Sequence, residues 1–96
     1  MDAATAQRLK DLAARRKALA AANGRVDDAE QALARTTENQ ARVRENLAAV
    51  PADSALGQRY AEMLAKDEDT LATLSAQRAE AEKDARAKRD ALVNAF

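Results

Sequence analysis

An apolar residue recurs at every seventh position through the first half of the chain, and this repeat restricts the fold more than any other feature. Its members are Leu12, Leu19, Val26, Leu33 and Leu47, with the polar Gln40 between the last two. A second set, three residues later, includes Val43. Spacings of three and four residues alternate between the a and d positions of a coiled coil. The repeat therefore predicts a long helix over residues 3–49 that packs against another helix.

The pair Asn23-Gly24 offers a competing interpretation, because this dipeptide often ends a helix. A loop at this point would shift the phase of the seven-residue repeat. Leu19, Val26 and Leu33 nevertheless stay in phase across the pair. We therefore predict that the helix continues through Gly24, at a cost of about 1 kcal/mol relative to alanine.

The only proline of the chain, Pro51, marks the strongest interruption. Proline disfavours the helical conformation in the residue before it and has no backbone N–H to donate. Asp53 and Ser54 follow, and either side chain offers an oxygen atom to cap a second helix. The sequence thus predicts a hairpin turn over 50–53 and a second helix over 53–94.

The second helix carries a matching stripe of larger residues, which are Tyr60, Leu64, Leu71, Leu74 and Leu92. Two long helices joined by a short connection form an antiparallel hairpin, here a single hairpin domain over 1–96. The two stripes match when the numbers of facing residues add up to 107, which places Gln40 opposite Asp67. A tighter turn would shift this register by a few residues. A single polar layer of this kind fixes the register of a coiled coil.

The composition predicts a thin core that needs a further covering surface. Hydrophobic residues make up 47% of the chain, but it has only one tyrosine, one phenylalanine and no tryptophan. Much of the remainder is alanine, which buries little area, so a lone hairpin would be marginally stable. The larger apolar residues outside the stripes are Leu9, Leu56, Met63, Val93 and Phe96. We expect a homodimer that forms a four-helix bundle or, alternatively, contact with the rest of a parent chain.

Several classes of chemistry find no support in the sequence. The absence of cysteine and histidine argues against thiol or imidazole catalysis and most zinc sites, and we predict no catalytic residue, metal or cofactor. Sixteen basic residues balance sixteen acidic ones. The basic segments 14–17 and 83–90 come with few aromatic residues, so we predict no nucleic-acid partner. No apolar run approaches the roughly 20 residues that span a bilayer, which predicts no membrane insertion.

The stretch "ENQARVRENLAAVPADSALGQRYAEMLAKDEDTLATL", residues 38–74, resembles the helical C-terminal region of a family of bacterial proteins of unknown function. The matching elements are "RVRENL" before the turn, and "DSALGQRY" and "EDTLATL" after it. Members of that family are large, envelope-associated proteins with a β-rich domain. The resemblance implies an exported parent protein with this hairpin as a projecting or oligomerising part. It implies no catalytic residues.

These observations together favour a non-catalytic interaction module. The leading hypothesis is a coiled-coil hairpin that mediates self-association or docks on a partner, as a fragment of a larger bacterial protein. The alternative is an adaptor or chaperone-like hairpin that binds one protein partner.

Overall fold

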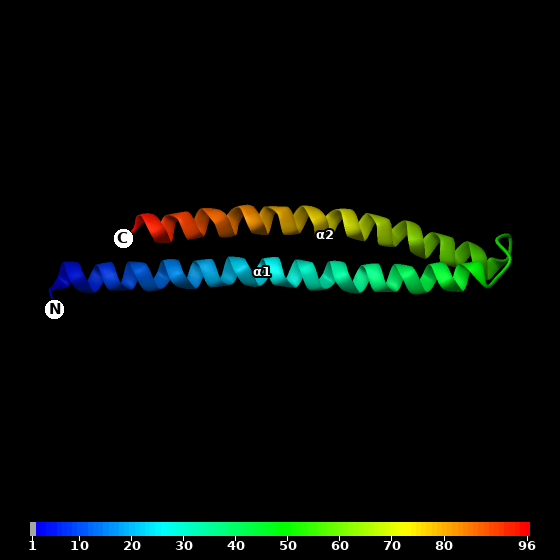
Figure 1. The fold of residues 1–96 in the computed structure, drawn as a ribbon, viewed down its shortest axis with the longest axis horizontal. Coiled ribbons are helices and arrows are strands. Elements are labelled where there is room, and N and C mark those ends of the chain that lie inside the picture. The colour runs from blue at the N-terminus through cyan, green and yellow to red at the C-terminus, as the bar shows by residue number, and fades with distance from the viewer. Residues whose placement is uncertain (1) are drawn as a thin grey trace. The chain divides into compact units, whose positions relative to one another are not determined.

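A computed structural model describes residues 2–96 and shows an all-α helical hairpin, which confirms the predicted fold class. Helix α1 comprises Ala3–Ala48 and helix α2 comprises Ala55–Asn94. The turn between them is drawn in green in Figure 1. Asp2 caps α1, because its Oδ1 accepts a hydrogen bond of 2.7 Å from the Thr5 N–H.

Both helix ends at the turn differ slightly from the prediction. Helix α1 ends one residue earlier than predicted, and the N–H groups of Ala49 and Val50 bond to carbonyls three residues back. Such bonds tighten the last turn of a helix. Helix α2 begins two residues later than predicted, because Ser54 rather than Asp53 stands directly before its first residue.

Helix α1 runs without a break through Asn23 and Gly24, as the phase of the repeat predicted. Gly24 has a negative backbone φ, and a Cβ added there would meet no atom within 4 Å. Neither a turn nor a close contact therefore requires glycine at this position.

The packing of the helices divides the chain into two compact units. Unit 1 combines the described residues up to Asp28 with Arg78–Phe96, and unit 2 is Ala29–Gln77. In unit 1 the buried apolar residues are alanines, namely Ala22, Ala81 and Ala85. In unit 2 they are Ala29 and Val43, and the polar Gln40 is buried beside them. Each unit pairs a part of α1 with an antiparallel part of α2.

Candidate interaction surfaces

The turn of unit 2 is organised around Ser54. Its Oγ accepts a hydrogen bond of 3.0 Å from the Gly57 N–H and donates one of 2.6 Å to the Pro51 carbonyl. The Ser54 N–H also bonds to the Pro51 carbonyl, at 3.1 Å. Of the two proposed caps, Ser54 is therefore the N-cap of α2. Pro51 and Asp53 lie exposed in the turn.

Gly57 is a structural requirement of this turn that the sequence analysis missed. The residue is buried, and a Cβ added to it would overlap the Pro51 carbonyl oxygen. The same Cβ would lie 3.1 Å from both the Ala52 carbonyl oxygen and the Ser54 Oγ. The capping turn therefore folds over Gly57, and only glycine fits without a shift of the backbone. Its place three residues after the capping serine was the signal available in the sequence.

The predicted polar layer is present in unit 2, but its pairing differs from the prediction. Gln40 is only 4% exposed, and its Nε2 donates to the Glu68 Oε1 at 2.5 Å. Asp67, which was predicted to face Gln40, instead accepts a hydrogen bond of 3.4 Å from the Nδ2 of Asn39. The long glutamine side chain thus reaches one residue further along α2 than the position predicted to face it. The residue numbers of the two observed pairs add up to 108 and 106, so the predicted register of 107 lies between them.

The two helices leave their predicted seam incompletely covered. Of its members only Val43 is buried, at 3% exposed. Ten seam residues are half-buried: Leu12, Leu19, Val26, Leu33, Leu47, Tyr60, Leu64, Leu71, Leu74 and Leu92. Among the described residues, no large side chain is completely enclosed. Each unit therefore shields its larger apolar side chains on one side only.

Two polar contacts join α1 to α2 in unit 1, one from Arg25 and one from Arg15, and the sequence analysis did not foresee them. Arg25 Nη2 lies 2.6 Å from the Asp84 Oδ2, and Lys88 Nζ lies 3.4 Å from the Asp84 Oδ1. The hydrogen bond from Arg25 holds the pKa of Asp84 below its usual value, with a smaller contribution from Lys88. Arg15, which interrupts the stripe of α1, donates from Nη1 to the Ala91 carbonyl at 2.8 Å. A charged residue is thus tolerated beside the seam because it reaches across to the other helix.

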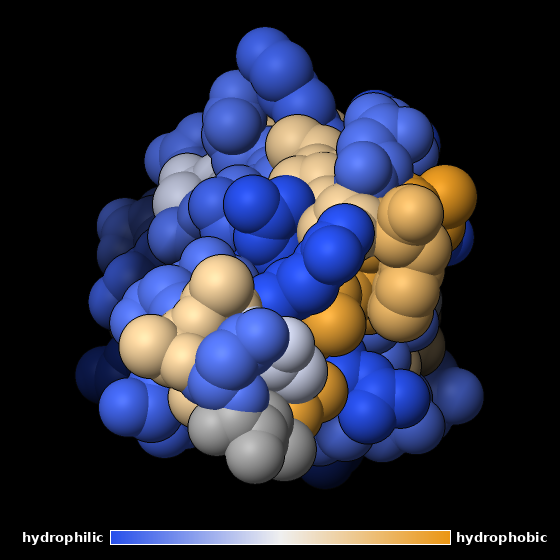
Figure 2. All heavy atoms as spheres, turned by 90° about the vertical axis from the view of Figure 1, so that its left-hand side faces the viewer, coloured by the Kyte–Doolittle hydropathy of each residue, from blue (hydrophilic) through white to orange (hydrophobic). Residues whose placement is uncertain are grey.

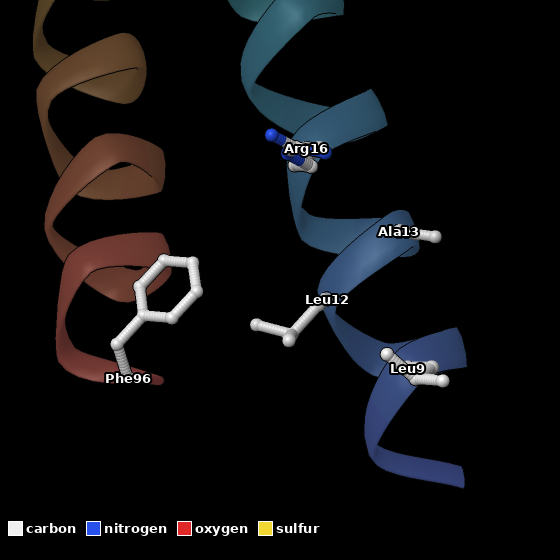
Figure 3. Close-up of a pocket in the computed structure, with 5 residues that line it drawn as sticks. All are labelled: Leu9, Leu12, Ala13, Arg16 and Phe96. Atoms are coloured by element: carbon white, nitrogen blue, oxygen red, sulfur yellow. The ribbon is translucent and has the colours of Figure 1, made fainter. Parts of the chain in front are cut away.

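A shallow hollow of about 240 Å³ lies in unit 1, lined by Leu9, Leu12, Ala13, Arg16 and Phe96. In Figure 3, the ring of Phe96 points from the end of α2 toward Leu12 on α1. Figure 2 looks onto the end of unit 1 near both termini and shows hydrophobic residues, in orange, gathered beside hydrophilic ones, in blue. Phe96 is 83% exposed and Leu9 is 51% exposed. The hollow is therefore apolar, open, and bordered by one guanidinium group.

Other large apolar side chains outside the seam are also exposed. Val93 lies in unit 1, and Leu56 and Met63 lie in unit 2. Together with Leu9 and Phe96, these are the five residues that the sequence analysis left over from the stripes. All five lie at the surface, which was the basis for the predicted docking role.

The described residues include no group of three or more acidic side chains placed to hold a metal ion. Over the same part of the chain, neither helix combines the length and the apolar character needed to cross a membrane. No family model, curated protein or solved structure matches this chain. The candidate surfaces are therefore argued from their own geometry.

Proposed function

We propose that this protein is a non-catalytic interaction module that associates with itself through the incompletely covered faces of its helical hairpin. The observation that carries this proposal is the exposure of the seam, where ten of the eleven predicted residues are only half-buried. Full burial of a leucine side chain contributes about 1.5–3 kcal/mol. Each half-buried leucine therefore leaves on the order of 1 kcal/mol that a further covering surface would supply.

The packing within unit 1 supports the same proposal. Ala22, Ala81 and Ala85 bring the two helices close together, but alanine contributes little buried area. A two-helix hairpin with so thin a core gains substantially from a second layer of helices. A dimer that forms a four-helix bundle supplies this layer from identical chains.

The second candidate function is an adaptor that binds one different protein, and the hollow in unit 1 favours it. Leu12 and Phe96 offer an apolar floor of the size that accepts one large side chain, and Arg16 borders it. A partner segment with an apolar residue next to a carboxylate fits this chemistry.

Circular dichroism melts at several protein concentrations distinguish the two functions. A self-associating module has a melting temperature that rises with concentration, because association stabilises the folded state by mass action. A hairpin that awaits a different partner melts at the same temperature at every concentration. The variant Leu12→Ala serves as the folding control. It removes an apolar residue that the seam and the hollow share, so it lowers the melting temperature whichever of the two functions is correct.

We further propose that the hairpin is part of a larger, envelope-associated bacterial protein, on the basis of the resemblance over residues 38–74. An antibody against the hairpin tests this on the native source. A band far heavier than 10.3 kDa supports a larger parent. A single band at that mass contradicts it.

A further inference from the structure

The two sides of the seam differ in charge within unit 2. In an antiparallel pair of helices, the e positions of both helices lie on one side of the seam and the g positions on the other. Two ion pairs agree with this assignment. Arg44 and Glu68 both occupy e positions in unit 2, and their charged groups lie 3.8 Å apart. Arg25 and Asp84, which also form an ion pair, both occupy g positions in unit 1. The g side of unit 2 carries no charged residue. We call it the uncharged flank, and it consists of Ala32, Asn39, Asn46, Leu56, Met63, Thr70 and Gln77.

The uncharged flank contains the two exposed apolar side chains of unit 2. Leu56 is 42% exposed and Met63 is 39% exposed, and they stand one heptad apart on α2. The opposite side of unit 2 carries Glu30 and the Arg44–Glu68 ion pair. Arg42 and Asp67 reach the flank through their hydrogen bonds to Asn39. The g positions themselves are depleted of charge, as are the positions of an interface core.

The g positions of unit 1 differ in side-chain size and charge from those of unit 2. They carry the small residues Ala18 and Ala91 together with the Arg25–Asp84 ion pair, and Asp11 is the remaining charged residue. Arg15 also reaches this side, through its hydrogen bond to the Ala91 carbonyl. Unit 1 therefore has small side chains at g positions where unit 2 has the larger side chains of leucine and methionine.

The two units carry opposite net charge. Unit 1 has eleven basic and eight acidic side chains, a formal charge of +3, and unit 2 has five basic and eight acidic side chains, a formal charge of −3. Contact between two copies of unit 2 would bring like charges together, whereas contact between unit 2 and unit 1 brings opposite charges together. Electrostatic complementarity of this kind selects the orientation of partners more than it sets affinity.

We propose that the uncharged flank of unit 2 docks on the g side of unit 1 of a second copy of this chain. The occupant of the flank is thus another copy, which presents unit 1 rather than unit 2. The inference rests on the proposed self-association and specifies its geometry. It leaves the hollow around Leu9 and Phe96, on the e side of unit 1, open to solvent or to another partner.

A pair of matched variants tests the surface. Met63→Glu places a carboxylate on the uncharged flank, and Ala61→Glu places the same group at an exposed e position two residues away. Both add one negative charge to unit 2, on opposite sides of the seam. Met63→Glu raises the dimer Kd by roughly tenfold or more, because it buries an unpaired carboxylate. Ala61→Glu leaves the Kd near that of the unmodified chain, and circular dichroism checks that both variants remain helical.

Energy transfer between labelled chains tests the orientation, since the chain has no native cysteine. Labels are attached through Ala52→Cys in the turn of unit 2 and Asn94→Cys near the end of α2 in unit 1. We expect transfer between an Ala52→Cys donor and an Asn94→Cys acceptor to exceed severalfold the transfer between two labels at the same site. Added salt weakens this association, because it screens the opposite charges.

The outcomes separate this inference from the proposed function. Stronger transfer between identical sites, or equal Kd values for Met63→Glu and Ala61→Glu, overturns the docking of unit 2 on unit 1 and leaves self-association standing. Absence of transfer in every combination, with an unmodified chain that sediments as a monomer, overturns both.

Discussion

Units 1 and 2 both pair antiparallel helices, yet they rely on different residues. Unit 1 packs alanine against alanine and adds polar links such as Arg25–Asp84 between the helices. Unit 2 buries the larger Val43, encloses the polar Gln40, and contains the capped turn. The same heptad pattern therefore supports two kinds of packing. In unit 1, alanines let the two helix backbones approach closely, whereas in unit 2 larger side chains fill the space between the helices. Five substitutions test that division, in order of decreasing expected effect.

The largest expected effect is in the turn of unit 2. Gly57→Ala places a methyl group against the Pro51 carbonyl oxygen, so the backbone must shift. Overpacking of this kind costs about 1–3 kcal/mol of unfolding free energy. Urea denaturation measures the change through the transition midpoint. An unchanged or raised midpoint would show that the turn is not closed over Gly57 as described.

Because the two units pack differently, truncation of a valine to alanine is expected to lower the free energy of unfolding by different amounts in the two units. Val43→Ala in unit 2 removes a side chain that is 3% exposed and costs about 2 kcal/mol. Val26→Ala in unit 1 removes a half-buried side chain and costs about half as much. Thermal and urea unfolding of both variants give the two values. Equal costs, or a larger cost at Val26, would contradict the contrast between the units.

Glycine in unit 1 has the opposite role to glycine in unit 2. Gly24 lies inside α1, and an added Cβ meets nothing within 4 Å. Gly24→Ala therefore stabilises the protein by about 1 kcal/mol, since alanine has the higher helix propensity. The urea midpoint rises for Gly24→Ala and falls for Gly57→Ala. A drop for Gly24→Ala would indicate that another chain approaches the backbone at this position.

The smallest expected effect is the pH dependence of unit 1. The hydrogen bond from Arg25 lowers the pKa of Asp84 below its ordinary value of 3.8. A group with a lowered pKa stabilises the folded state above its unfolded pKa, and this contribution is lost as pH falls through the folded pKa. The unmodified chain therefore loses more stability on acidification than Asp84→Asn does. Urea midpoints at neutral pH and at a pH below 3.8 measure the difference, and parallel losses in both proteins would refute the ion pair's role.

The heptad repeat and Pro51 were sufficient to predict the hairpin and the continuity of α1 through Gly24. They placed the seam, and they placed the register within one residue of the observed polar contacts. The seam and the register follow from the periodicity of the apolar residues, which is a property of the sequence alone. The hydrogen-bond partner of Gln40 could not be predicted in this way, because side-chain reach, rather than helical position, decides between Asp67 and Glu68.

The candidate surfaces depended more on the structure. The sequence identified the exposed apolar residues, because they fall outside the stripes. It did not identify Gly57, since its closeness to Pro51 depends on how the turn folds back. The Arg15–Ala91 contact joins residues 76 positions apart, and only the packed helices bring them together. The two-sided charge pattern of unit 2 required ion pairs that fix the e and g positions.

Sedimentation equilibrium of the unmodified chain at micromolar concentration tests the central claim most directly. The claim is that the hairpin completes its apolar faces by binding a second copy. It predicts a reversible association with a mass near twice the 10.3 kDa of one chain. A well-folded species that keeps the mass of one chain at every concentration would contradict it.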